Sequence, residues 1–137
     1  MRGATVIRNL VVGALLPLSV AGCFKDKSVK LEVAEILERD TTWDICYMKI
    51  VATNELDEPI ETLVATLTVN DLPVYDGYAN SFSTEKGRQK TDRIVIGQSY
   101  TEELYFKGEC PENAEITSVK IEACATTERD CSKDVTF

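Results

Sequence analysis

The sequence contains no histidine. This absence excludes Ser-His-Asp and Cys-His catalysis and every zinc or iron site that is ligated by histidine. The chain also has no Cys-x-x-Cys pair, no Gly-x-Ser-x-Gly nucleophile motif and no Asp-x-Asp-x-Asp-Gly calcium loop. Its neighbouring acids lie in predicted turns or on predicted solvent faces, where solvation explains them. The sequence therefore predicts a protein that is not an enzyme and uses no metal or cofactor.

The chain also has no apolar run that is long enough to cross a membrane. The segment Leu10–Val20 is apolar and uncharged, but as a helix it would rise only about 16 Å. The apolar core of a bilayer is about 30 Å thick. Arg2 and Arg8 precede this segment and small residues follow it, which is the pattern of a cleaved secretory signal.

The end of this segment, Val20-Ala21-Gly22-Cys23, resembles a bacterial lipobox, and the resemblance covers residues 1–23. It implies that Cys23 carries a diacylglyceryl group and that cleavage falls before it. Two or more acyl chains anchor a protein firmly to a membrane. Phe24, where an aspartate would favour the inner membrane, favours the outer membrane. The alternative is an ordinary cleaved signal followed by an unmodified cysteine.

The expected organisation is a signal peptide at 1–22, a lipidated tether at 23–28 and one domain at 29–137. Removing 22 residues from 137 leaves 115, which is the size of one domain. The signal holds two arginines and no acid, so the net charge falls from −8 to −10. Such an acidic domain is poorly suited to binding nucleic acid. Acidity of this kind either keeps an exported protein soluble or attracts a basic partner.

Strand signals dominate the mature chain. Apolar and polar residues alternate, or β-branched and aromatic residues gather, between segments rich in turn-forming residues. The expected strands are 29–33 with a possible extension to 39, 43–53, 60–70, 74–75, 93–96, 99–107, 116–124 and 131–137. Alternation places Leu63, Ala65, Leu67 and Val69 on one face of 60–70. In 99–107 it places Tyr100, Glu102, Leu104 and Phe106 on one side, with Thr101, Glu103 and Tyr105 on the other. Val119, Ile121 and Ala123 are expected to point inward, and Val135 and Phe137 close the domain.

About seven short strands without a long helix favour an all-β, antiparallel immunoglobulin-like sandwich. Residues 44–107 also resemble the FxLYD-like domains of bacterial lipoproteins. The resemblance depends on Ala52-Thr53-Asn54, Pro59-Ile60, Tyr75-Asp76-Gly77 and Ile96-Gly97-Gln98-Ser99, and the Phe-x-Leu element is absent. It implies an immunoglobulin-like fold and carries no function.

Four cysteines remain once Cys23 is assigned to lipid, and an even number in an oxidising compartment predicts two disulfides. The second and sixth strands of such a sandwich start at the same end, which favours Cys46–Cys110 with Cys124–Cys131. The alternative, Cys46–Cys124 with Cys110–Cys131, would resemble the core bridge of antibody domains.

The segment 75–93 is the predicted binding surface, because it mixes aromatic and basic residues in an acidic chain. The candidate contacts are Tyr75, Tyr78, Phe82, Arg88 and Arg93. The expected function is a lipid-anchored adaptor that binds another protein of the bacterial cell envelope. The alternative is an exclusion or inhibitor lipoprotein, of phage or plasmid type, that blocks an outer-membrane receptor or an envelope enzyme.

Overall fold

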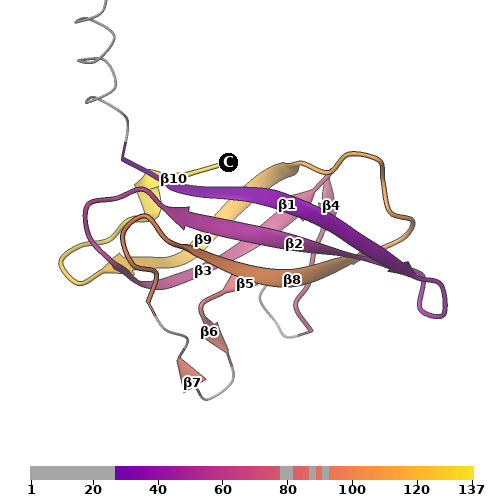
Figure 1. Ribbon diagram of the computed structural model, residues 1–137, viewed down its shortest axis with the longest axis horizontal. Coiled ribbons are helices and arrows are strands. Elements are labelled where there is room, and N and C mark those ends of the chain that lie inside the picture. The colour runs from indigo at the N-terminus through magenta and orange to yellow at the C-terminus, as the bar shows by residue number, and fades with distance from the viewer. Residues whose placement is uncertain (1–26, 78–81, 87–88, 91–92) are drawn as a thin grey trace, which may run out of the picture.

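The computed structural model describes residues 27–77, 82–86, 89–90 and 93–137. Cys23, Tyr78 and Arg88 lie outside the described residues, as do the predicted signal peptide and most of the tether. Short strands make up most of the described chain (Figure 1). They are β1 (Val29–Asp40), β2 (Ile45–Asn54), β3 (Ile60–Val69), β4 (Leu72–Pro73), β5 (Phe82–Ser83), β6 (Glu85–Lys86), β7 (Gln89–Lys90), β8 (Ser99–Lys107), β9 (Ile116–Thr126) and β10 (Val135–Thr136), with a 3-10 turn η1 (Ser132–Asp134).

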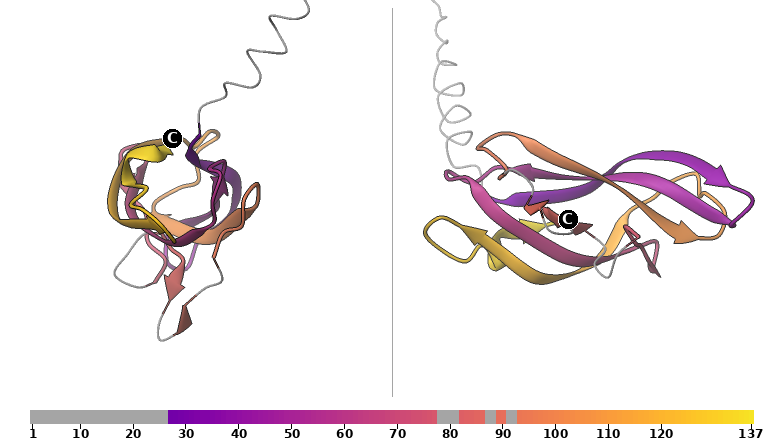
Figure 2. Two further views of the ribbon diagram at one scale, coloured as in Figure 1. Left: turned by 90° about the vertical axis from the view of Figure 1, so that its left-hand side faces the viewer. Right: turned by 90° about the horizontal axis from the view of Figure 1, so that it is seen from below.

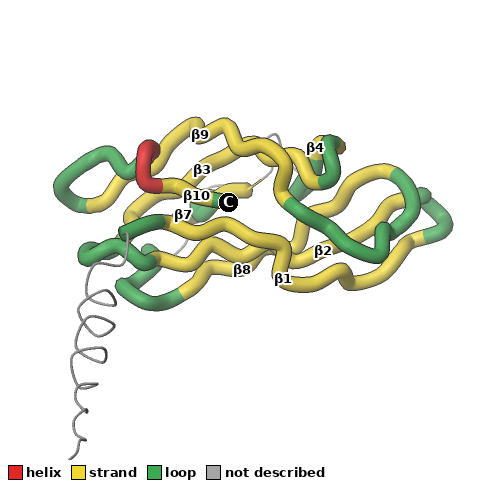
Figure 3. Tube along the Cα trace, turned by 90° about the horizontal axis from the view of Figure 1, so that it is seen from above, coloured by secondary structure: helices red, strands yellow, loops and turns green. Residues whose placement is uncertain are grey.

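The strands form two main sheets and a small hairpin. One sheet has the order β10-β1-β2-β8, the other joins β9, β3, β4 and β5, and β6 pairs with β7. Seen end-on, the two main sheets enclose the interior (Figure 2), and from above β1, β2 and β8 lie on one side of it with β3 and β9 on the other (Figure 3). Consecutive strands β2 and β3 lie in different sheets, as do β8 and β9, which is the immunoglobulin-like arrangement. The predicted fold class is confirmed.

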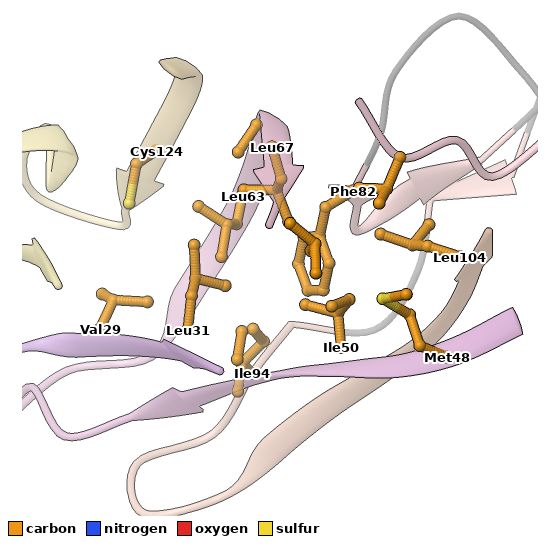
Figure 4. Packing of buried hydrophobic residues seen from close by; sticks show 14 of the residues in the cluster. Val29, Leu31, Met48, Ile50, Leu63, Leu67, Phe82, Ile94, Leu104 and Cys124 are labelled. Carbon is orange, nitrogen blue, oxygen red and sulfur yellow. The ribbon is translucent and has the colours of Figure 1, made fainter. Parts of the chain in front are cut away.

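The core lies between the sheets and follows the predicted alternation. The inner faces of β1, β2 and β8 meet the inner face of β3 (Figure 4). Leu63, Ala65, Leu67 and Val69 of β3 are fully buried, as the period of two predicted. On β8, Glu102, Leu104 and Phe106 are buried and Tyr100 packs against the core.

Several predicted positions are wrong near the ends of strands. The expected strand 93–96 contains only a bridge at Ile94, and Ile96 begins a turn. Trp43 was expected in a strand, but it lies in a turn and is 71% exposed, because the Asp40 carboxylate accepts the backbone N–H groups of Thr42 and Trp43. Ala123 loses its inner position to Cys124, because a β-bulge near it shifts the alternation. Phe137 was expected in the last strand, but β10 ends at Thr136 and the Phe137 side chain is 63% exposed.

Both disulfides of the preferred pairing are present. Cys46 of β2 joins Cys110, with 5.1 Å between the Cα atoms, and Cys124 of β9 joins Cys131, with 5.0 Å between them. The first closes the connection after β8 onto the start of β2. The second closes the connection between β9 and η1.

Candidate functional site

The predicted binding segment does not form one surface. Tyr75 exchanges two backbone hydrogen bonds with Tyr105, of 2.8 and 2.9 Å, and so extends the first sheet beyond β8. Arg93 lies beside the start of β3, where its guanidinium is 3.2 Å from the Glu61 carboxylate. The structure therefore separates the two described surface residues of the predicted set.

Phe82 corrects the prediction further, because it is a core residue. Its side chain is fully buried, and its ring meets that of Tyr100 edge-on, with 5.6 Å between the centroids. The prediction that Phe82 contacts a partner is therefore wrong for the folded domain. Sequence reasoning placed it in an exposed loop because most of its neighbours are polar.

Polar side chains hold the Phe82 segment against the interior. The Tyr100 hydroxyl donates to the Ser83 carbonyl at 3.0 Å, and the buried Glu102 carboxylate accepts the Ser83 N–H at 3.0 Å. Thr84 bonds the Leu63 backbone on the other side. Glu102, which was expected on a solvent face, is therefore a structural acceptor, because a buried carboxylate is stable only when it is hydrogen-bonded.

Three tyrosines form a row across the outer face of the first sheet. Tyr47 of β2 is directly opposite Tyr105 of β8, and Tyr75 continues the row. The centroid distance is 5.9 Å in both neighbouring pairs, with tilted rings. Tyr47 and Tyr105 are half-buried and Tyr75 is 40% exposed, so the rings are supported by one another and still reach solvent.

A shallow groove adjoins this row along β1. Its lining residues are Leu37, Glu38, Asp40, Tyr47, Lys49 and Glu103, and we call it the tyrosine groove. Its volume is about 730 Å³, which is enough for several side chains of a partner. The groove is open to solvent, whereas sites for small molecules usually bury most of the ligand.

The tyrosine groove is acidic. Glu38, Asp40 and Glu103 line it, and its one cation, Lys49, lies 3.7 Å from Glu35 at the edge. Among the residues that the structure describes, Glu38 and Glu103 form no ion pair with a neighbour. The groove thus combines an apolar and aromatic wall with an excess of negative charge, since three acidic side chains and one lysine line it.

Sequence reasoning missed this groove although one signal for it was visible. Alternation along 99–107 already placed Glu103 and Tyr105 on the face opposite to the core. The register between β2 and β8, which brings Tyr47 beside Tyr105, follows from pairing across more than fifty residues and has no local signature.

Comparison with known proteins found no family model, no curated protein and no solved structure that matches the chain. Within the described ranges, no helix is long and apolar enough to span a membrane. The same residues contain no group of three or more side chains placed to hold a metal ion.

Proposed function

We propose that this protein is a membrane-anchored lipoprotein of the bacterial cell envelope that binds a protein partner through the tyrosine groove. The observation that carries the proposal is the groove itself, which is lined by Tyr47 and acidic side chains and adjoins the row that Tyr47 forms with Tyr105 and Tyr75 on the sheet face. Tyrosine offers a large apolar surface with a polar end and little rotamer freedom to lose, so it is enriched in protein interfaces. The anchor rests on the lipobox-like sequence that ends at Cys23.

The negative charge of the groove favours a partner with basic residues. The carboxylates of Glu38 and Glu103 are exposed, and the chain as a whole carries a net charge of −8. A basic segment of the partner would be attracted by this field, and its lysine or arginine side chains would also stack on tyrosine rings. We therefore expect a partner that presents basic residues and binds less tightly as salt is raised.

Co-purification tests the proposal. The variant Glu38→Lys/Glu103→Lys reverses two charges in the groove, and both side chains are exposed, so we expect it to fold normally. It should lose the envelope protein that the wild-type chain captures after mild solubilisation. The matched control, Glu112→Lys/Glu115→Lys, reverses two exposed charges outside the groove and should keep the partner. Equal capture by both variants would reject the groove as the binding surface.

A further inference from the structure

Two large apolar side chains are exposed at the end where the chain enters the domain. Val95 is 51% exposed and Ile96 is 50% exposed, and they are consecutive in a tight turn. The Gln98 N–H donates to the Val95 carbonyl at 2.9 Å, and Gly97 has a φ of +77°, which glycine adopts without strain. The Val95 and Ile96 side chains therefore face solvent and are not packed into the core between the sheets.

Hydrogen bonds brace this turn against the start of the domain. Asn54 donates its backbone N–H to the Gln98 carbonyl at 2.9 Å and accepts the Gly97 N–H at 2.8 Å. Its buried side-chain amide also donates to the Ile94 carbonyl at 2.9 Å. The next residue, Glu55, donates its N–H to the Ser28 carbonyl at 2.8 Å. The exposed pair is therefore held beside the residues that follow the tether.

The length of the tether limits how far this end lies from the membrane. Cys23 to Lys27 spans at most about 14 Å when it is fully extended. By contrast, β1 runs for 12 residues and carries the turn with Trp43 roughly 40 Å away, at the right-hand end in Figure 1. Of the two ends of the sandwich, only the end with Val95 and Ile96 is kept near the bilayer.

Charges at this end favour an apolar contact over an electrostatic one. Lys27 is 2.7 Å from Asp57, Arg93 pairs with Glu61, and Arg129 is 3.6 Å from Glu58. Because acids pair with these three cations, the described ion pairs leave little positive charge there for anionic head groups. Transfer of the exposed valine and isoleucine side chains from water to the boundary between head groups and acyl chains instead lowers the free energy.

We propose that the Val95–Ile96 turn is a second membrane contact, which inserts into the interfacial region of a phospholipid bilayer beside the lipid-modified Cys23. The inference rests on the anchor in the proposed function. Two contacts at one end orient the sandwich with the Trp43 turn directed away from the membrane. They also keep the tyrosine groove, on the side of the first sheet, open to partners.

The single tryptophan of the chain makes this orientation measurable. The full chain is purified from bacterial membranes with its lipid and placed in phosphatidylcholine vesicles with brominated acyl chains, which quench nearby tryptophans. Wild type reports on Trp43, whereas Trp43→Phe/Ile96→Trp and Trp43→Phe/Val95→Trp report on the turn at two positions. We expect a loss of fluorescence and a blue shift for both turn variants, and neither effect for Trp43.

Flotation with the vesicles separates the possible failures. A protein that floats but shows no quenching at either turn position would overturn the membrane contact and leave the anchor in place; a protein partner for the turn would then be the remaining occupant. Quenching of Trp43 alone would overturn the orientation. A protein that does not float would overturn both the anchor and the inference that depends on it.

Discussion

The structure and the sequence-based prediction give opposite expectations for the effect of replacing Phe82 by alanine. As a partner contact, Phe82 would be dispensable for folding. As a core residue, it loses a fully buried ring and its edge-on contact with Tyr100. Phenylalanine-to-alanine changes in protein cores cost about 3–5 kcal/mol. We expect Phe82→Ala to lower the free energy of unfolding by about that amount.

Urea unfolding followed by far-ultraviolet circular dichroism measures this effect, with both disulfides kept intact. With a slope of about 2 kcal/mol per molar urea, a loss of 4 kcal/mol lowers the midpoint by about 2 M. Trp43 is a poor reporter because it is already exposed in the folded state.

Two matched variants control this experiment. Phe82→Leu keeps most of the apolar volume and should cost less than about 1.5 kcal/mol. Arg93→Ala removes an exposed side chain from the same predicted binding set and should change stability by about 0.5 kcal/mol or less. If Phe82→Ala unfolds at the wild-type midpoint, the placement of Phe82 in the core is refuted.

Three further predictions concern the disulfides, the end of the domain and the anchor. Removing the Cys46–Cys110 bridge, which spans a sequence separation of 64, should lower the free energy of unfolding by about 4 kcal/mol; a non-reduced peptide that joins Cys46 to any other cysteine would refute the pairing. The Lys27 ammonium holds the pKa of Asp57 below its ordinary value through a 2.7 Å contact. Lys27→Ala should therefore raise that pKa in an NMR titration, and an unchanged pKa would contradict the contact. Because the pKa is lowered in the folded state, the small stabilisation from this exposed pair is present above the unfolded-state pKa and is lost as the pH falls through the folded-state value. Mass spectrometry of the mature N-terminal peptide should find a diacylglyceryl group on Cys23; an unmodified thiol there would exclude the lipid anchor.

The fold was predictable because burial on a strand alternates with a period of two. The alternation in 60–70 grouped the side chains that are buried on β3, and that in 99–107 grouped the side chains that face the interior from β8. The same rule failed at Ala123, because a bulge is set by the register with β3 and not by the residues of β9 alone. It also failed at Trp43, where the Asp40 side chain stabilises a turn in place of a strand.

The candidate site was less predictable because it depends on pairing across the sheet. The sequence placed Tyr105 on an outer face but could not place Tyr47 beside it. It also placed Phe82 on the surface, because the bonds from Tyr100 and Glu102 that draw this segment inward come from a strand that begins many residues later. The residues next to Phe82 in the sequence do not indicate those hydrogen bonds.

Site-specific photocrosslinking in the native envelope tests the binding function most directly. A photoreactive amino acid replaces Tyr105 on the groove side, or Lys120, which is exposed on the other sheet. We expect one dominant protein adduct from position 105 that is weakened by salt and absent from position 120. The same adducts at both positions, or none at position 105 in cells that retain the lipidated protein, would contradict a binding role for the tyrosine groove.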